Sequence, residues 1–146
     1  MNAMVGEKLS IITSKSQTTR HRILGIDDDE PLPLVLSVGP CIFRNSVLAA
    51  LDAIGRPWRI VLSTPSLSGI RAAVRAGLGV GVRTERWLEP DIRVLDGELP
   101  PLPDVELVMI SAPDTGEMVV DRLRTALREA LTLPAARTVA KVVGSN

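Results

Sequence analysis

The stretch WRIVLSTPSLSGIRAAVRAGLGVGVR, residues 58–83, decides the fold of this chain. Short apolar runs open and close it, a hydroxyl-rich turn follows the first run, and apolar residues at helical spacing lie between. This order predicts a β-α-β unit, in which a helix joins two parallel strands. The apolar runs do not alternate cleanly with polar residues, which is typical of strands covered on both faces.

The helix of this unit has a predicted start and a predicted end. Thr64 is placed to cap the first turn, with Pro65 at the first helical position, where a missing N–H costs nothing. Gly77 is placed to end the helix in the left-handed conformation. Because a helix start presents unpaired backbone N–H groups, the turn from Ser63 to Ser66 is a candidate receptor for a small anion. The alternative is that Thr64 only caps its own helix.

Composition favours a soluble single domain with an aliphatic core. The chain has 146 residues, 45% of them hydrophobic and only 2% aromatic. Lys and Arg number 17, as do Asp and Glu, and no basic block occurs. Direct binding of nucleic acid needs a basic face or aromatic stacking partners. The sequence therefore argues against direct nucleic-acid binding by this chain.

Metal, disulfide and membrane functions are equally unsupported by the residues. Cys41 is the single cysteine and His21 the single histidine, which excludes an internal disulfide and the usual zinc ligand sets. We expect no metal and no cofactor. No apolar run approaches the roughly 20 residues of a membrane span, and no signal-peptide pattern opens the chain. We expect a cytoplasmic protein.

The pattern divides the chain into three parts. Residues 1–32 are expected to be an irregular N-terminal segment, in which only 9–12 suggest a short strand. Its acidic run, 27–30, is interpreted as a solvated loop because a calcium loop needs a glycine turn and a distal ligand. Residues 33–133 form the ordered domain, and residues 134–146 are expected to be a flexible tail.

Regular elements alternate within the ordered part. We expect a strand at 33–38, a helix at 41–54, an edge strand at 92–95, a strand at 105–111 and a final helix up to Leu131. Asp114 and Glu117 form a capping-box pattern at the start of that helix. The predicted fold class is α/β, with a mostly parallel sheet flanked by helices.

A longer succession resembles a known family. PLPLVLSVGPCIFRNSVLAALDAIGRPWRIVLSTPSLSGIRAAVRAGLGVGV is similar to the second lobe of the effector-binding domain of LysR-type transcriptional regulators. STPSLSGIRAAV followed by AGLGV is its most specific part. LPDVELVMIS resembles the strand that returns through the hinge, and residues 116–131 resemble the terminal helix. The resemblance covers roughly residues 31–133. A helix-turn-helix and most of the first lobe have no counterpart in the chain.

The resemblance implies one lobe of a domain that is similar in fold to type II periplasmic binding proteins. It implies a small-molecule effector, often an organic anion, held between two lobes. It places Thr64, Pro65, Ser66 and Leu67 on the rim of the cleft. The other residues of the expected ligand site are Ser63 of the turn and the strand residues Gly79, Val80, Gly81, Val82 and Arg83.

Arg83 stands where many family members have an apolar residue followed by proline. An arginine there can supply a bidentate clamp for an anion. The alternative is a solvated charge at the end of a strand. The expected function is non-enzymatic sensing by a truncated effector-binding domain.

Two further hypotheses concern partners and chemistry. The final helix carries an apolar stripe, Val119, Leu123 and Leu127, which we expect to be partly exposed. Because large exposed apolar patches favour association, we expect a homo-oligomer or pairing with an intact regulator. A protein-interaction module of that kind is the main alternative function. Less favoured is a small enzyme that uses Cys41, because a helix start favours the reactive thiolate. Such an enzyme needs a base, and a buried structural cysteine is commoner.

Overall fold

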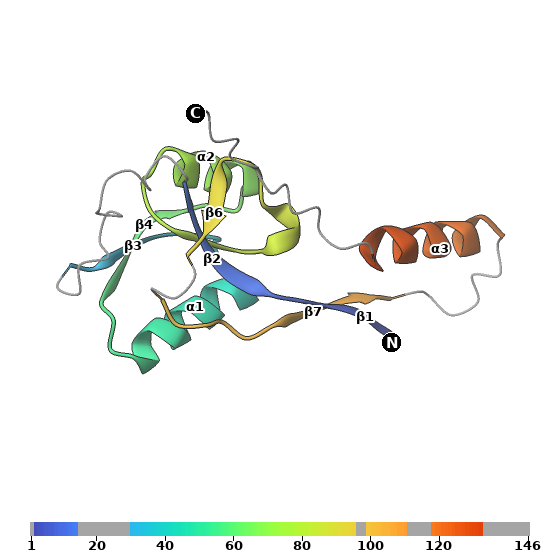
Figure 1. The fold of residues 1–146 in the computed structure, drawn as a ribbon, viewed down its shortest axis with the longest axis horizontal. Helices are drawn as coiled ribbons and strands as arrows, with labels where there is room; N and C mark the ends of the chain where they lie inside the picture. Colours follow the sequence, from blue (N-terminus) through green and yellow to red (C-terminus); the bar gives the residue numbers. More distant parts are fainter. Residues whose placement is uncertain (1, 15–29, 96–98, 111–117, 133–146) are drawn as a thin grey trace, which may run out of the picture.

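The computed structural model describes residues 2–14, 30–95, 99–110 and 118–132. In these ranges the chain forms three helices, a 3₁₀ turn and seven strands (Figure 1). The helices are α1 (Ile42–Ala53), α2 (Leu67–Arg75) and α3 (Met118–Thr132), and the 3₁₀ turn is Glu85–Trp87. The strands are β1 (Asn2–Glu7), β2 (Leu9–Ser14), β3 (Leu32–Leu36), β4 (Trp58–Ser63), β5 (Gly81–Thr84), β6 (Ile92–Val94) and β7 (Val105–Met109).

The main sheet combines parallel and antiparallel pairs. β3 and β4 are parallel, while β2 lies between β5 and β6 and is antiparallel to both. A parallel bridge between Leu34 and Val80 joins the two groups, so the strand order is β4-β3-β5-β2-β6. The expectation of an α/β fold is confirmed. The expectation of a mostly parallel sheet is correct for β3, β4 and the bridge to β5, and wrong for the strands around β2.

The N-terminal residues are part of the core, which corrects the expectation of an irregular segment over residues 1–32. All six residues of β2 are buried, because β2 pairs with a strand on each side. The short strand suggested for residues 9–12 is confirmed. The rest of this segment does not look like a buried strand in the sequence because its buried residues include hydroxyl side chains. The Ser10 hydroxyl, for example, donates to Glu85 Oε1 at 3.2 Å. The acidic residues 27–29 and the tail 134–146 lie outside the described residues.

Helices α1 and α2 cover opposite faces of the sheet (Figure 1). On the α1 face, Val47 and Leu51 are fully buried in a cluster with strand residues such as Leu34. On the α2 face, Ile70 and Val74 pack with Val35. Ile54, the last residue of the predicted helix at 41–54, lies beyond α1, which ends at Ala53, and its side chain is 58% exposed.

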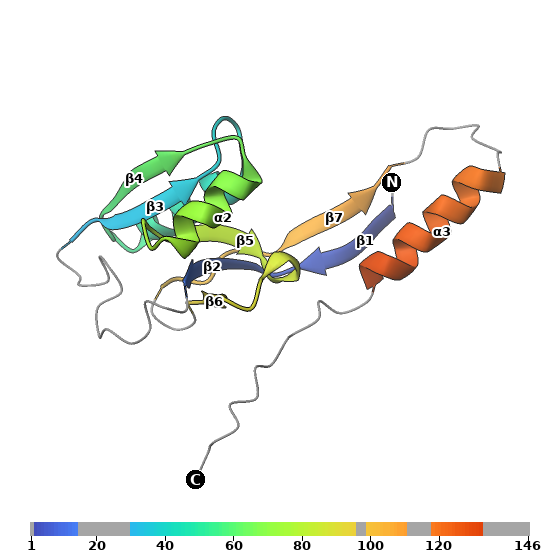
Figure 2. The ribbon, with the colours of Figure 1, turned by 90° about the horizontal axis from the view of Figure 1, so that it is seen from above.

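The two ends of the described chain form an arm beside the sheet. β1 and β7 pair antiparallel, and α3 packs on β1 (Figures 1 and 2). Arg86, in the 3₁₀ turn, ties this arm to the main sheet, since it pairs with Glu7 of β1 and donates from Nη2 to the Leu131 carbonyl of α3 at 2.8 Å. The Glu7 side chain is only 10% exposed, so this contact is shielded from solvent.

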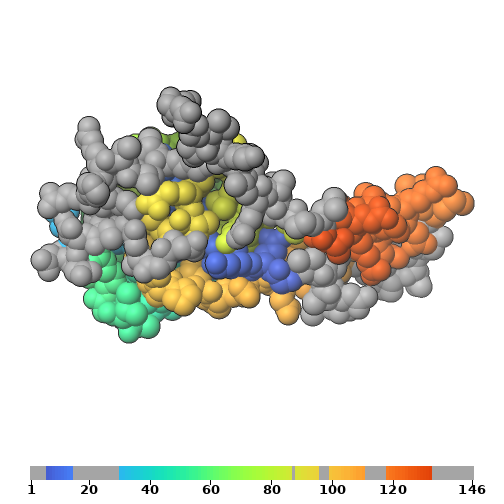
Figure 3. Space-filling view, viewed as in Figure 1, coloured from blue at the N-terminus to red at the C-terminus, as the bar shows by residue number. Residues whose placement is uncertain are grey.

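The outer face of α3 is uncovered, as the sequence predicted. No described residue of α3 is buried, and Val119, Leu123 and Leu127 are 73%, 57% and 42% exposed. The space-filling view shows α3 extending away from the rest of the molecule (Figure 3). The predicted capping box at Asp114 and Glu117 lies outside the described residues.

Gly79 gives a direct test of the sheet's central contact. A Cβ at this position would lie 2.6 Å from the carbonyl oxygen of Pro33 on β3, and backbone cannot move aside there. Gly79→Ala should therefore lower the free energy of unfolding by about 1–3 kcal/mol or more, measured by urea denaturation. The matched control is Gly6→Ala in β1, where a Cβ meets nothing within 4 Å. Equal effects of the two variants would contradict this close approach.

Candidate functional site

The turn between β4 and α2 is organised by two hydroxyls. Ser66 is the helix N-cap, and its Oγ accepts a hydrogen bond from the Gly69 N–H at 3.1 Å. Thr64 Oγ1 accepts from the Ser66 N–H at 3.1 Å. This corrects the prediction that Thr64 caps the helix with Pro65 at the first helical position. The helix begins two residues later, because Thr64 binds the backbone of the turn and leaves capping to Ser66.

The turn lies at the carboxyl ends of β3 and β4. The Thr64 N–H donates to the Leu36 carbonyl at 3.1 Å, and the Val38 N–H donates to the Thr64 carbonyl at 3.4 Å. α1 starts at the same edge, from where Arg44 Nη1 reaches the Ser37 carbonyl at 3.3 Å and Ser63 Oγ at 3.4 Å. In α/β sheets, the carboxyl ends of parallel strands are the usual place for a ligand.

Arg44 was not among the residues singled out from the sequence. The sequence does contain a signal for Arg44. A positive charge in the first turn of a helix is unfavourable next to the positive end of the helix dipole, so an arginine there indicates a role outside the helix. Here that role is to join the ends of β3 and β4 to α1.

The ten predicted site residues divide into two groups in the structure. Those of the turn face solvent, with Ser63, Pro65, Ser66 and Leu67 exposed and Thr64 half-buried. The strand residues Gly79, Val80, Gly81 and Val82 are buried inside the sheet. They are buried because β5 runs between β3 and β2, so they support the edge from below and present no side chain to solvent. Arg83 is the exception on this strand.

Arg83 is half-buried near the end of β5. Its guanidinium lies over the ring of Phe43, 5.5 Å from the centroid, and Phe43 belongs to the first turn of α1. Burial lowers the pKa of Arg83, Cys41 opposes this, and Arg71 acts in the same direction as burial. Arginine nevertheless stays protonated. Within the described residues, the buried Nε of Arg83 has no hydrogen-bond partner, and no carboxylate forms an ion pair with its guanidinium. Arg83 is thus a cation held at the same edge as the turn.

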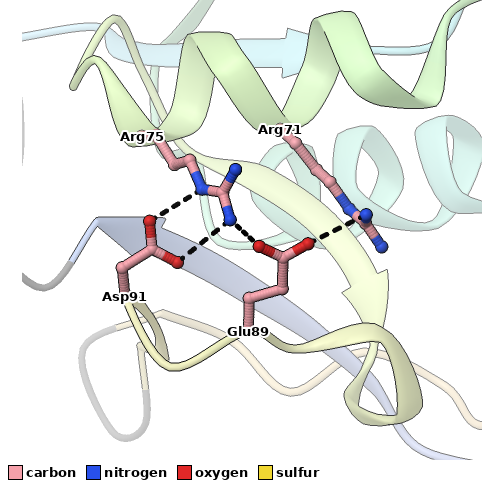
Figure 4. A network of polar contacts seen from close by, with 4 residues as sticks. All are labelled: Arg71, Arg75, Glu89 and Asp91. Carbon is pink, nitrogen blue, oxygen red and sulfur yellow. Dashed lines mark hydrogen bonds and ion pairs between the residues drawn. The ribbon is translucent and has the colours of Figure 1, made fainter.

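Ion pairs hold α2 in place on the sheet. Arg71 Nη1 lies 2.9 Å from Glu89 Oε1, and Arg75 pairs with both Glu89 and Asp91, its Nε being 2.7 Å from Asp91 Oδ2 (Figure 4). The two carboxylates lie between the 3₁₀ turn and β6. Single exposed pairs contribute about 0–1 kcal/mol, but a shared network restricts the helix more strongly. Arg71 is therefore paired with Glu89, whereas Arg44 reaches Ser63 of the turn and Arg83 lies over Phe43 of α1.

A hollow of about 730 Å³ lies elsewhere, on the outer side of α1. Cys41 lies at its margin as a half-buried free thiol and is the N-cap of α1. None of the ten predicted site residues lines this hollow. Its lining is Pro40, Cys41, Ile42, Asn45, Ser46, Ala49, Ala50 and Pro103.

The remaining chemistry of the described part is limited. No group of three or more His, Cys, Asp or Glu in these ranges is arranged to hold a metal ion. Of the helices described, none is both long enough and apolar enough to cross a bilayer. His21, the single histidine of the sequence, lies outside the described residues.

Comparison with known proteins identifies the family. The family described as LysR substrate binding domain matches residues 4–132. The chain belongs to this family. It is 38% identical over 100 residues to the HTH-type transcriptional regulator PecT of Dickeya dadantii, and 34% identical over 82 residues to DgdR of Burkholderia cepacia. These matches cover 67% and 55% of this chain but 32% and 28% of the regulators. The chain thus spans about a third or less of the regulators' length.

Solved structures agree on the fold. The regulatory domain of CcmR from Synechocystis, in complex with 2-PG, superposes with a TM-score of 0.56 at 16% identity, over 90% of this chain and 66% of that one. The regulatory domain of the HypT M206Q mutant from Salmonella typhimurium gives a TM-score of 0.63 at 11% identity, over 91% of this chain and 68% of that one. The fold is therefore that of LysR regulatory domains, about a third of which has no counterpart here.

A second group of similar proteins consists of sequences named GTPase Era. The chain is 39% identical over 103 residues to GTPase Era of Xanthomonas oryzae pv. oryzae, covering 68% of this chain and 31% of that protein. The phosphate-binding pattern G-x-x-x-x-G-K-[ST] occurs nowhere in the present sequence. The family assignment rests on the domain match over residues 4–132.

The capping role of Ser66 can be tested directly. Ser66→Ala removes the acceptor for the Gly69 N–H and should lower the free energy of unfolding by about 0.5–2 kcal/mol. Ser68→Ala, at the exposed second residue of α2, is the matched control and should change the free energy of unfolding by less than about 0.5 kcal/mol. Urea denaturation measures both. If Ser66→Ala were as mild as its control, the observed helix start would be wrong.

Proposed function

We propose that this chain is a non-enzymatic effector-binding lobe of a LysR-type regulator, which binds a small organic anion at the carboxyl edge of β3, β4 and β5. The observation that carries this proposal is the convergence of positive groups at that edge. Arg44 and Arg83 lie there, together with the starts of α1 and α2, whose backbone N–H groups favour an anion.

The chemistry of the turn supports the same ligand class. The Thr64 and Ser66 oxygens already accept hydrogen bonds from the backbone, so their O–H groups are left to donate. A ligand at this edge would meet hydroxyl donors, backbone donors and guanidinium groups, all of which favour a carboxylate or phosphate. The complex of the CcmR regulatory domain with 2-PG adds that a relative in fold binds a small molecule.

Affinity should be weak in the isolated chain. Ligand pockets commonly bury about 70–90% of the ligand surface, and an open edge provides contacts from one side only. We therefore place the working form in an assembly, either a homo-oligomer or a complex with an intact regulator, in the cytoplasm. DNA contact belongs to such a partner, because this sequence has no basic block and only 2% aromatic residues. Pairing alone, without an effector, is the alternative that the exposed stripe of α3 favours.

Titration with a small anion tests the site. Adding 2-PG to the ¹⁵N-labelled chain should shift the amide signals of Ser63, Thr64, Ser66, Leu67 and Arg83, with saturation in the millimolar range. Arg83→Gln should weaken binding by about tenfold, because a charge-assisted hydrogen bond is lost.

Arg59→Gln is the matched control, since Arg59 is exposed near the amino end of β4, away from this edge. It should leave the dissociation constant within about twofold. Signal changes confined to other parts of the chain, or equal losses in the two variants, would overturn the proposed site.

A further inference from the structure

The exposed face of α3 has a self-complementary shape. At about 100° per residue, Val119, Leu123, Ala126 and Ala130 fall on one narrow stripe of the helix. Val119 and Leu123 are 73% and 57% exposed, and both alanines are exposed. The two larger side chains thus lie in the first half of the stripe and the two alanines in the second half, so a second helix running in the opposite direction sets large side chains against small ones.

The flanks of this stripe differ from each other. On one side, Val120, Arg124 and Leu131 are half-buried, and that side of the helix packs on β1. On the other side stand Arg122 and Glu129, both exposed and seven residues apart. Seven residues are close to two helical turns, so the two opposite charges occupy equivalent places on the free flank.

We propose that two copies of this chain pair through α3, with the two helices antiparallel. In this arrangement Leu123 of one copy packs against Ala126 of the second copy, and Val119 packs against Ala130. The free flanks then face each other, so that Arg122 of each copy meets Glu129 of the other, twice in the dimer.

The charge pattern selects this orientation. In a parallel pair the free flank would face the opposite flank of the second helix, which carries Leu127 and no carboxylate. Arg122 would then lack an opposite charge across the interface, and Glu129 would have only Arg124, which lies on the side that packs on β1. The antiparallel pair satisfies both and also covers the apolar stripe. This proposal does not depend on effector binding.

Charge reversal tests the contact. Sedimentation equilibrium should show a reversible dimer of the unaltered chain. Arg122→Glu places two carboxylates opposite each other at both contacts and should raise the dissociation constant by about tenfold or more. The double variant Arg122→Glu/Glu129→Arg restores opposite charges and should return it to near the original value.

Arg128→Glu is the matched control, because Arg128 is an exposed arginine on the far side of α3 from the stripe. Its dimer should remain within about twofold of the unaltered chain. Circular dichroism checks that each variant keeps its helices. A monomer at every concentration, failure of the double variant to recover, or an equal loss in Arg128→Glu would each overturn the proposal.

Cross-linking tests the direction of the helices. In a Cys41→Ser background, Val119→Cys with Ala130→Cys should form a disulfide-linked dimer on mild oxidation. The two positions are about 16 Å apart along one helix, so they cannot bridge within a single copy. Val119→Cys alone should remain largely unlinked. Strong linking through Val119→Cys alone indicates parallel helices and would overturn the antiparallel arrangement.

Discussion

Backbone pairing between Val80 and β3 is the constraint on which the rest of the structure depends. The Val80 N–H donates to the Pro33 carbonyl, and the Val35 N–H donates to the Val80 carbonyl, each at 2.9 Å. This short contact joins a parallel pair of strands to an antiparallel group of three. It requires Gly79, because any side chain there would meet the Pro33 backbone. Without this contact, the cluster under α1, which contains both Leu34 and Val80, would be divided.

The same contact positions the candidate site. Since β5 runs parallel to β3 at the bridge, Arg83 arrives at the edge where β3 and β4 end and α1 begins. The turn at Thr64 is hydrogen-bonded to that edge through the Leu36 carbonyl and the Val38 N–H. The ion pairs of Glu89 and Asp91 hold α2, and with it the capped helix start, against the sheet. The proposed effector site is thus a property of strand order rather than of one motif.

The arm formed by β1, β7 and α3 is a second consequence of the chain path. β1 and β2 are separated by a single residue, so the N-terminal strand continues from the buried sheet into the arm. Arg86 closes the connection by contacting both Glu7 and the last turn of α3. The arm therefore has a defined inner side and an outer side with exposed apolar residues.

The sequence by itself determined the local elements of this protein. The glycine at position 77 adopts the left-handed conformation that ends the turn after α2, and the apolar runs around residues 60 and 107 are strands as predicted. The resemblance of the β4-α2-β5 stretch indicated the LysR family, which the domain match shows. The uncovered stripe of α3 was also predictable, since its periodicity is contained in one helix.

Only the tertiary structure decided what depends on distant pairing. The insertion of β2 between β5 and β6 buries polar residues such as Thr13, and no local pattern distinguishes those from loop residues. It also decided that residues 80–82 run between β3 and β2, and that Arg44 reaches two strand ends. Helix caps and helical periodicity depend on residues a few positions apart, so they can be predicted from the sequence. Strand order and the convergence of Arg44 with Arg83 depend on contacts between distant segments, which the periodicity of one segment does not encode.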